Sequence, residues 1–68
     1  MKTTEKKMLE ILNATLKTVN SILAENGNDK GAQIFIAQFG AQQYLIEELT
    51  NKRVNLVGSG KDMTAILV

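Results

Sequence analysis

The chain has 68 residues, a net charge of +1, and no cysteine, histidine, tryptophan or proline. Without cysteine and histidine it has no disulfides, no usual zinc ligand set, and neither the commonest catalytic base nor the strongest nucleophile. The remaining acidic residues have no catalytic or metal-binding spacing. We therefore expect no enzyme, no cofactor and no metal site, and we expect residues 1–68 to form a single domain.

The sequence also bears on location. The first residues are polar and no continuous apolar segment follows them, so we expect no signal peptide. The longest uncharged run, residues 31–46, is 16 residues long and contains four glutamines. A membrane span needs about 20 mostly apolar residues. We therefore expect a cytoplasmic protein that does not cross a membrane.

Residues 3–26 predict an amphipathic helix, because apolar residues recur at intervals of three and four. Asn26 and Gly27 predict its end, since glycine readily adopts the left-handed conformation found at helix C-termini. The apolar stripe covers only about two heptads, which favours packing in a core over a coiled coil. The stripe consists of Leu9, Leu12, Leu16, Val19 and Leu23.

A loop is expected at residues 26–31, and residues 32–52 then allow two interpretations. In the first, they form one helix that pairs with the preceding helix as a helical hairpin. This arrangement places Gln38 and Gln42 near the middle of the apolar face, which argues against it. The other members of that face are Phe35, Phe39, Ile46 and Leu49.

The preferred interpretation divides this segment at Gly40. Residues 33–38, rich in β-branched and aromatic side chains, are then a strand, and residues 41–51 are a short helix. This division places both Gly31 and Gly40 at element boundaries. The apolar face of the short helix carries Ala41, Tyr44, Leu45 and Leu49.

Residues 54–57 and 63–68 predict a β-hairpin around the turn at 58–62. The predicted fold class is α+β, in the order helix, strand, helix, strand, strand; the alternative is a helical hairpin followed by a β-hairpin. A strand at 33–38 is apolar on both faces. Two short helices can cover one face of the sheet but are too small to cover both faces. We therefore expect a homodimer or higher oligomer.

These features predict a small non-catalytic oligomeric module for protein interaction, of the size of the accessory, regulatory or inhibitor proteins of phages. Tyr44 is the best candidate for an exposed anchor, because aromatic residues are enriched at interfaces. The binding surface is predicted to consist of Tyr44, Gln42, Gln43 and Glu47.

Two alternatives stay open. A nucleic-acid-binding regulator would contact phosphates through Lys52, Arg53 and Lys61, although so few cations and a near-neutral chain make nucleic acid the weaker choice. A small-molecule or nucleotide binder at a subunit interface would cradle an anion with Lys61 and the backbone amides of Ser59 and Gly60. This segment lacks the spacing of a phosphate-binding loop, so a simple hairpin turn is favoured.

Overall fold

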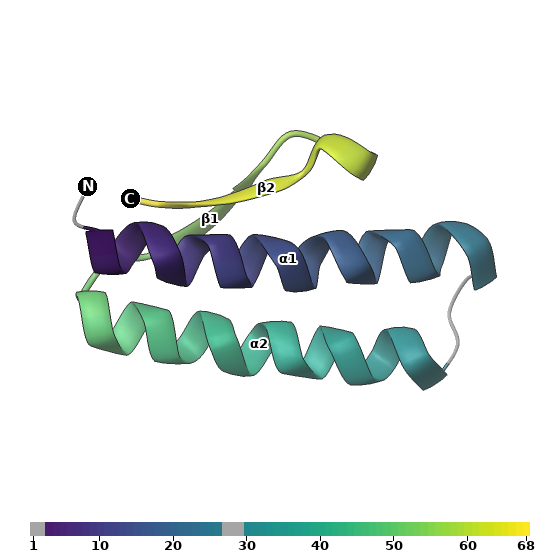
Figure 1. Ribbon diagram of the computed structural model, residues 1–68, viewed down its shortest axis with the longest axis horizontal. Coiled ribbons are helices and arrows are strands. Elements are labelled where there is room, and N and C mark those ends of the chain that lie inside the picture. Colours follow the sequence, from purple (N-terminus) through teal and green to yellow (C-terminus); the bar gives the residue numbers. More distant parts are fainter. Residues whose placement is uncertain (1–2, 27–29) are drawn as a thin grey trace.

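The computed structural model describes residues 3–26 and 30–68 of the chain. Two antiparallel helices lie side by side, and a β-hairpin lies over the first of them (Figure 1). The molecule measures 36 × 21 × 16 Å. The α+β class and the C-terminal hairpin are confirmed. The elements are α1 (Thr3–Asn26), α2 (Lys30–Thr50), β1 (Val54–Val57), the short 3-10 helix η1 (Gly60–Asp62) and β2 (Thr64–Leu67).

The strand predicted at residues 33–38 is wrong, and the alternative helical hairpin is correct. Helix α2 starts at Lys30, inside the expected loop, and continues through Gly40 without a break. Tertiary packing decides this segment, because residues spaced by three and four along α2 face α1 and override the local preference for a strand. Those residues include Ala32, Phe35, Phe39 and Ile46, all of them buried or half-buried.

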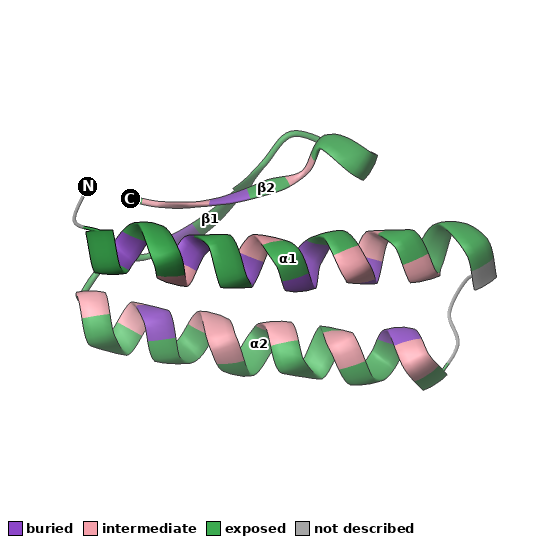
Figure 2. Ribbon diagram, in the orientation of Figure 1, coloured by how far each residue is buried: buried purple, intermediate pink, exposed green. Residues whose placement is uncertain are grey.

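The core lies where α1, α2 and the hairpin meet (Figure 2). The predicted stripe of α1 is buried there, apart from Leu23, which is 38% exposed near the end of the helix. Leu12 is the only large side chain among the described residues that is fully buried. The core is therefore thin. Its buried apolar residues are Leu9, Leu12, Leu16, Val19, Ala32, Ile46, Val54 and Ala65.

The two strands pair antiparallel, with Val54 opposite Leu67 at one end of the ladder. Arg53 and Val68 extend this ladder by exchanging two backbone hydrogen bonds of 3.1 and 2.9 Å. Hydrogen-bonded and non-hydrogen-bonded pairs alternate along an antiparallel ladder. The backbone groups of Val54 and Ala65 therefore point away from the partner strand, toward the two open edges of the sheet.

Side chains from the helices occupy both edges at these residues. On the β2 edge, Asn13 of α1 accepts a hydrogen bond from the Ala65 N–H at 2.7 Å and donates one to the Ala65 carbonyl at 3.1 Å. On the β1 edge, the Glu47 carboxylate of α2 accepts a hydrogen bond from the Val54 N–H at 2.9 Å. Each helix thus holds one strand of the hairpin in place. Neither described helix is long and apolar enough to cross a membrane.

Candidate functional site

The side of α2 that is turned away from α1 is exposed along most of its length (Figure 2). We call this side the outer face of α2; helical periodicity assigns to it the residues Ile34, Ala37, Ala41, Tyr44 and Leu45. Ile34 is 66% exposed, Tyr44 62% and Leu45 56%. A contiguous apolar surface of this kind marks an interaction site more often than a surface of scattered apolar residues does.

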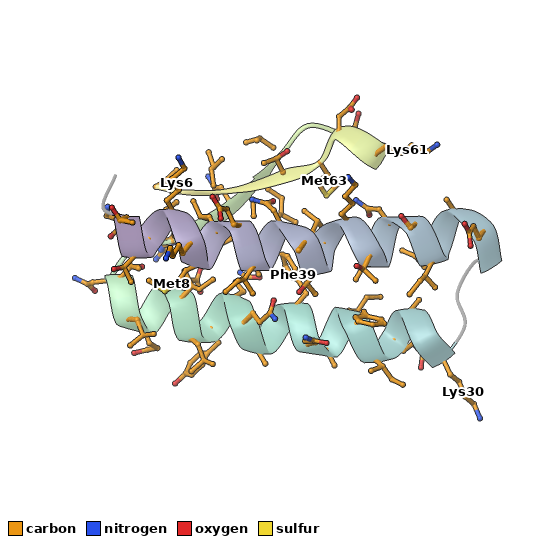
Figure 3. The ribbon with its side chains drawn as sticks, in the orientation of Figure 1. Lys6, Met8, Lys30, Phe39, Lys61 and Met63 are labelled. Carbon is orange, nitrogen blue, oxygen red and sulfur yellow. The ribbon has the colours of Figure 1, made fainter. Side chains whose placement is uncertain are left out.

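The apolar surface continues from α2 onto α1. Leu45 and Leu49 of α2 line a groove of about 180 Å³ together with Met8 and Ile11 of α1. Leu49 is 74% exposed and Ile11 58%. Half-buried Met8 points toward α2 (Figure 3). The groove and the outer face of α2 share Leu45, so they form one surface across the helical hairpin.

The four predicted partner-binding residues all lie on α2 but have different surroundings. Tyr44 lies on the outer face, as an anchor residue should. Gln42 is half-buried and its Oε1 accepts a hydrogen bond of 2.8 Å from the Thr15 hydroxyl, while Glu47 bonds to the backbone of β1. Gln43 is half-buried. Two of the four polar side chains are thus already engaged within the chain.

The sequence interpretation missed Ile34 as a surface residue because it placed that residue in a strand. It placed Leu45 and Leu49 on the apolar face of the short helix but named only Tyr44 of that face as an exposed anchor, whereas both leucines are exposed as well. One signal of the true surface was present, since residues 31–46 contain no charge at all.

The three predicted phosphate-contacting cations do not form one patch. Lys52 Nζ lies 3.0 Å from the carboxylate of Glu5, which is only 8% exposed, so its charge is compensated within the chain. Arg53 is exposed beside it. Lys61 lies in η1, at the opposite end of the hairpin (Figure 1).

A hollow of about 210 Å³ lies between α1 and η1. It is lined by Lys61 together with Lys17, Asn20 and Ser21 of α1. The Asn20 amide donates a hydrogen bond of 3.3 Å to the Gly60 carbonyl and so ties the turn to the helix. The sequence interpretation identified Lys61 but missed Lys17, because only the docking of the hairpin on α1 brings these two lysines to one hollow.

Among the described residues, no group of three or more acidic side chains is placed to hold a metal ion. Comparison of the chain with protein families, with curated proteins and with solved structures found no match. The surfaces described above are therefore the basis for inferring function.

Proposed function

We propose that this chain is a small non-catalytic interaction module that associates with a second copy of itself through the outer face of α2. The main support for this proposal is that large apolar side chains are exposed on that face and along the adjoining groove. They are Ile11, Ile34, Tyr44, Leu45 and Leu49.

Burial of this surface would add to a core that is thin in the single chain. Full burial of one leucine or isoleucine side chain contributes about 1.5–3 kcal/mol. A domain of this length buries only about 60% of the surface that its unfolded chain exposes, so further burial by association has a large relative effect. Disulfides are excluded by the composition, which leaves association as a source of added stability.

A second copy of the chain suits the surface better than a charged partner. Residues 31–46 contain no charged side chain, so this part of α2 can meet its copy without like-charge repulsion. The same residues offer no charge that would attract a charged ligand. A two-fold dimer uses the same patch on both subunits, which requires a patch complementary to itself. Pairing two copies in this way would bury the apolar outer face of α2 on both of them.

Sedimentation velocity of the wild-type chain over a range of concentrations, compared with Leu45→Glu, tests the proposal. We expect a dimer for the wild type and a folded monomer for the variant, because the introduced carboxylate would be buried without a partner. Val57→Glu is the matched control, since it places the same charge on an exposed residue of β1. A wild-type chain that stays monomeric at high micromolar concentration would overturn self-association.

The hollow between α1 and η1 favours a second candidate function, the binding of a phosphate group. Lys17 and Lys61 bring two positive charges to one concave site, and Ser21 adds a hydroxyl donor. Neither lysine forms an ion pair with any described residue. The hollow is smaller than the roughly 300–1,000 Å³ of most small-molecule sites, so it fits one phosphate group better than a whole nucleotide.

Thermal unfolding with inorganic phosphate and with a nucleoside monophosphate tests this second function. Phosphate binding to the folded chain should raise the melting temperature, and Lys17→Gln should remove the rise. Lys7→Gln is the control, because it removes the same charge from an exposed position outside the hollow. No rise for the wild type excludes the site. Binding of a single-stranded oligonucleotide that weakens steeply with salt would support the nucleic-acid alternative instead.

A further inference from the structure

Lys30 and Glu48 stand at opposite ends of α2 but on the same side of it. They are 18 residues apart in the helix, which is five turns and about 27 Å along the axis. Lys30 points away from α1 (Figure 3), and both side chains are exposed. Neither forms an ion pair with another described residue. The outer face of α2 is therefore apolar in the middle, positive at its start and negative at its end.

This order of charges is the reverse of what a single helix favours. Partial positive charge at a helix N-terminus favours acidic side chains, and partial negative charge at the C-terminus favours basic ones. Helix α2 has no acidic residue in its first turn and no basic residue in its last turn. The neighbouring Glu47 has a role in the chain, since it bonds to Val54, but Lys30 and Glu48 have no partner within the described residues.

We propose that the second copy packs on the outer face of α2 in an antiparallel orientation, with Lys30 of each copy beside Glu48 of the partner subunit. This inference rests on the self-association proposed above and specifies its geometry. Each unfavourably placed charge then gains an opposite charge and the opposite end of a helix. A parallel pairing would instead bring Lys30 beside its own copy, which is repulsive.

The apolar residues fit the same antiparallel register. A two-fold axis that pairs residue 30 with residue 48 also pairs Ile34 with Tyr44 of the partner subunit, and Ala37 with Ala41 of the partner subunit. The alanines lie at the middle of the face, where their small side chains allow two helix backbones to approach closely. The larger Ile34 and Tyr44 lie on either side of them and cover the contact.

Charge reversal tests the orientation. Lys30→Glu or Glu48→Lys alone places two like-charge pairs in each dimer, and we expect the dissociation constant to rise by about tenfold. The double variant Lys30→Glu/Glu48→Lys restores both pairs and should return the constant to within about threefold of wild type. Each single reversal matches the helix dipole, so circular dichroism should show undiminished helix content and exclude unfolding as the cause.

Disulfide cross-linking gives a second, geometric test, because the chain contains no cysteine. An antiparallel dimer predicts cross-linked dimers when Lys30→Cys and Glu48→Cys are mixed, and none when either is oxidised alone. Asn55→Cys, on the exposed side of the hairpin, should not cross-link to Lys30→Cys. A wild-type dimer in which each variant cross-links alone, or in which charge reversal has no effect, overturns this orientation but leaves self-association intact. A monomeric wild type overturns both.

Discussion

The side-chain amide of Asn13 pairs with both backbone groups of Ala65, accepting from its N–H at 2.7 Å and donating to its carbonyl at 3.1 Å. These two hydrogen bonds have the form of those that a neighbouring strand would make. They join residues 52 positions apart in the chain. Ala65 is only 1% exposed, so the amide meets backbone groups that little water can reach. One side chain of α1 thus fixes the position of β2.

Replacement of this amide should destabilise the fold. Asn13→Ala leaves the N–H and carbonyl of Ala65 without these partners, and we expect the free energy of unfolding to fall by about 1–3 kcal/mol. Urea unfolding measures the loss. Asn20→Ala is the control, because it removes a single exposed hydrogen bond to η1 and should cost about 0.5 kcal/mol or less. Equal losses for the two variants would contradict the role given to Asn13.

The hydrogen bond between Thr15 and Gln42 should appear as coupling in a double-mutant cycle. Thr15→Val removes the hydroxyl and leaves Gln42 Oε1 without its donor, so we expect a loss of about 1 kcal/mol. In Gln42→Leu that acceptor is absent, and the same threonine substitution should cost less. A coupling energy of about 0.5–1.5 kcal/mol in urea unfolding is expected. Strictly additive losses would show that the bond does not stabilise the helix pair.

The two glycines of the hairpin turn should differ in their tolerance of alanine. Gly58 has φ +89°, and a Cβ there would lie 2.6 Å from the Asp62 carbonyl oxygen; Gly60 has φ +56° and open space around it. Gly60→Ala should therefore cost about 1–2 kcal/mol, the strain of a left-handed conformation. Gly58→Ala should cost more, since the backbone must also move. Thermal unfolding of the two variants gives the order of their stability losses. A larger loss for Gly60→Ala than for Gly58→Ala would contradict this geometry.

Gly40→Ala should instead stabilise the chain. Gly40 lies inside α2, and a Cβ there would meet nothing within 4 Å. Alanine in a helix interior is favoured over glycine by about 0.5–1 kcal/mol. The measurement is urea unfolding in the Leu45→Glu background, where association is not expected to contribute. A loss of stability in that background would reveal a contact at Gly40 that the fold does not account for.

Sequence periodicity identified α1 because most of its apolar residues lie on one side of the helix, and that side is buried. It failed for α2, which has apolar residues on two sides: Phe39 faces α1, whereas Leu45 is exposed. Strand preference at residues 33–38 and the glycine at position 40 then favoured the wrong division. The objection to a polar Gln42 in the helix interface is removed by the Thr15 hydroxyl, which only the packed structure brings to it.

For the candidate site, sequence alone identified Tyr44 as a candidate for exposure and Lys61 as a cation near a turn. It did not identify Asn13 or Glu47 as residues that bind the backbone of a strand, because no sequence pattern shows which side chain will bond to a distant backbone group. The opposed charges of Lys30 and Glu48 were visible as residues, but their alignment depends on an unbroken α2. Once α2 is one helix, five whole turns place them on one side.

The edge contacts of Asn13 and Glu47 also bear on whether a further strand can add to the hairpin. An incoming strand would have to displace Asn13 from Ala65 on one edge and Glu47 from Val54 on the other. Open edges that accept strands allow growth without end, as in amyloid fibres. The proposed association through α2 about a two-fold axis would instead close after two copies. The contacts of Asn13 and Glu47 therefore hinder strand addition at Ala65 and Val54, one residue on each edge of the hairpin.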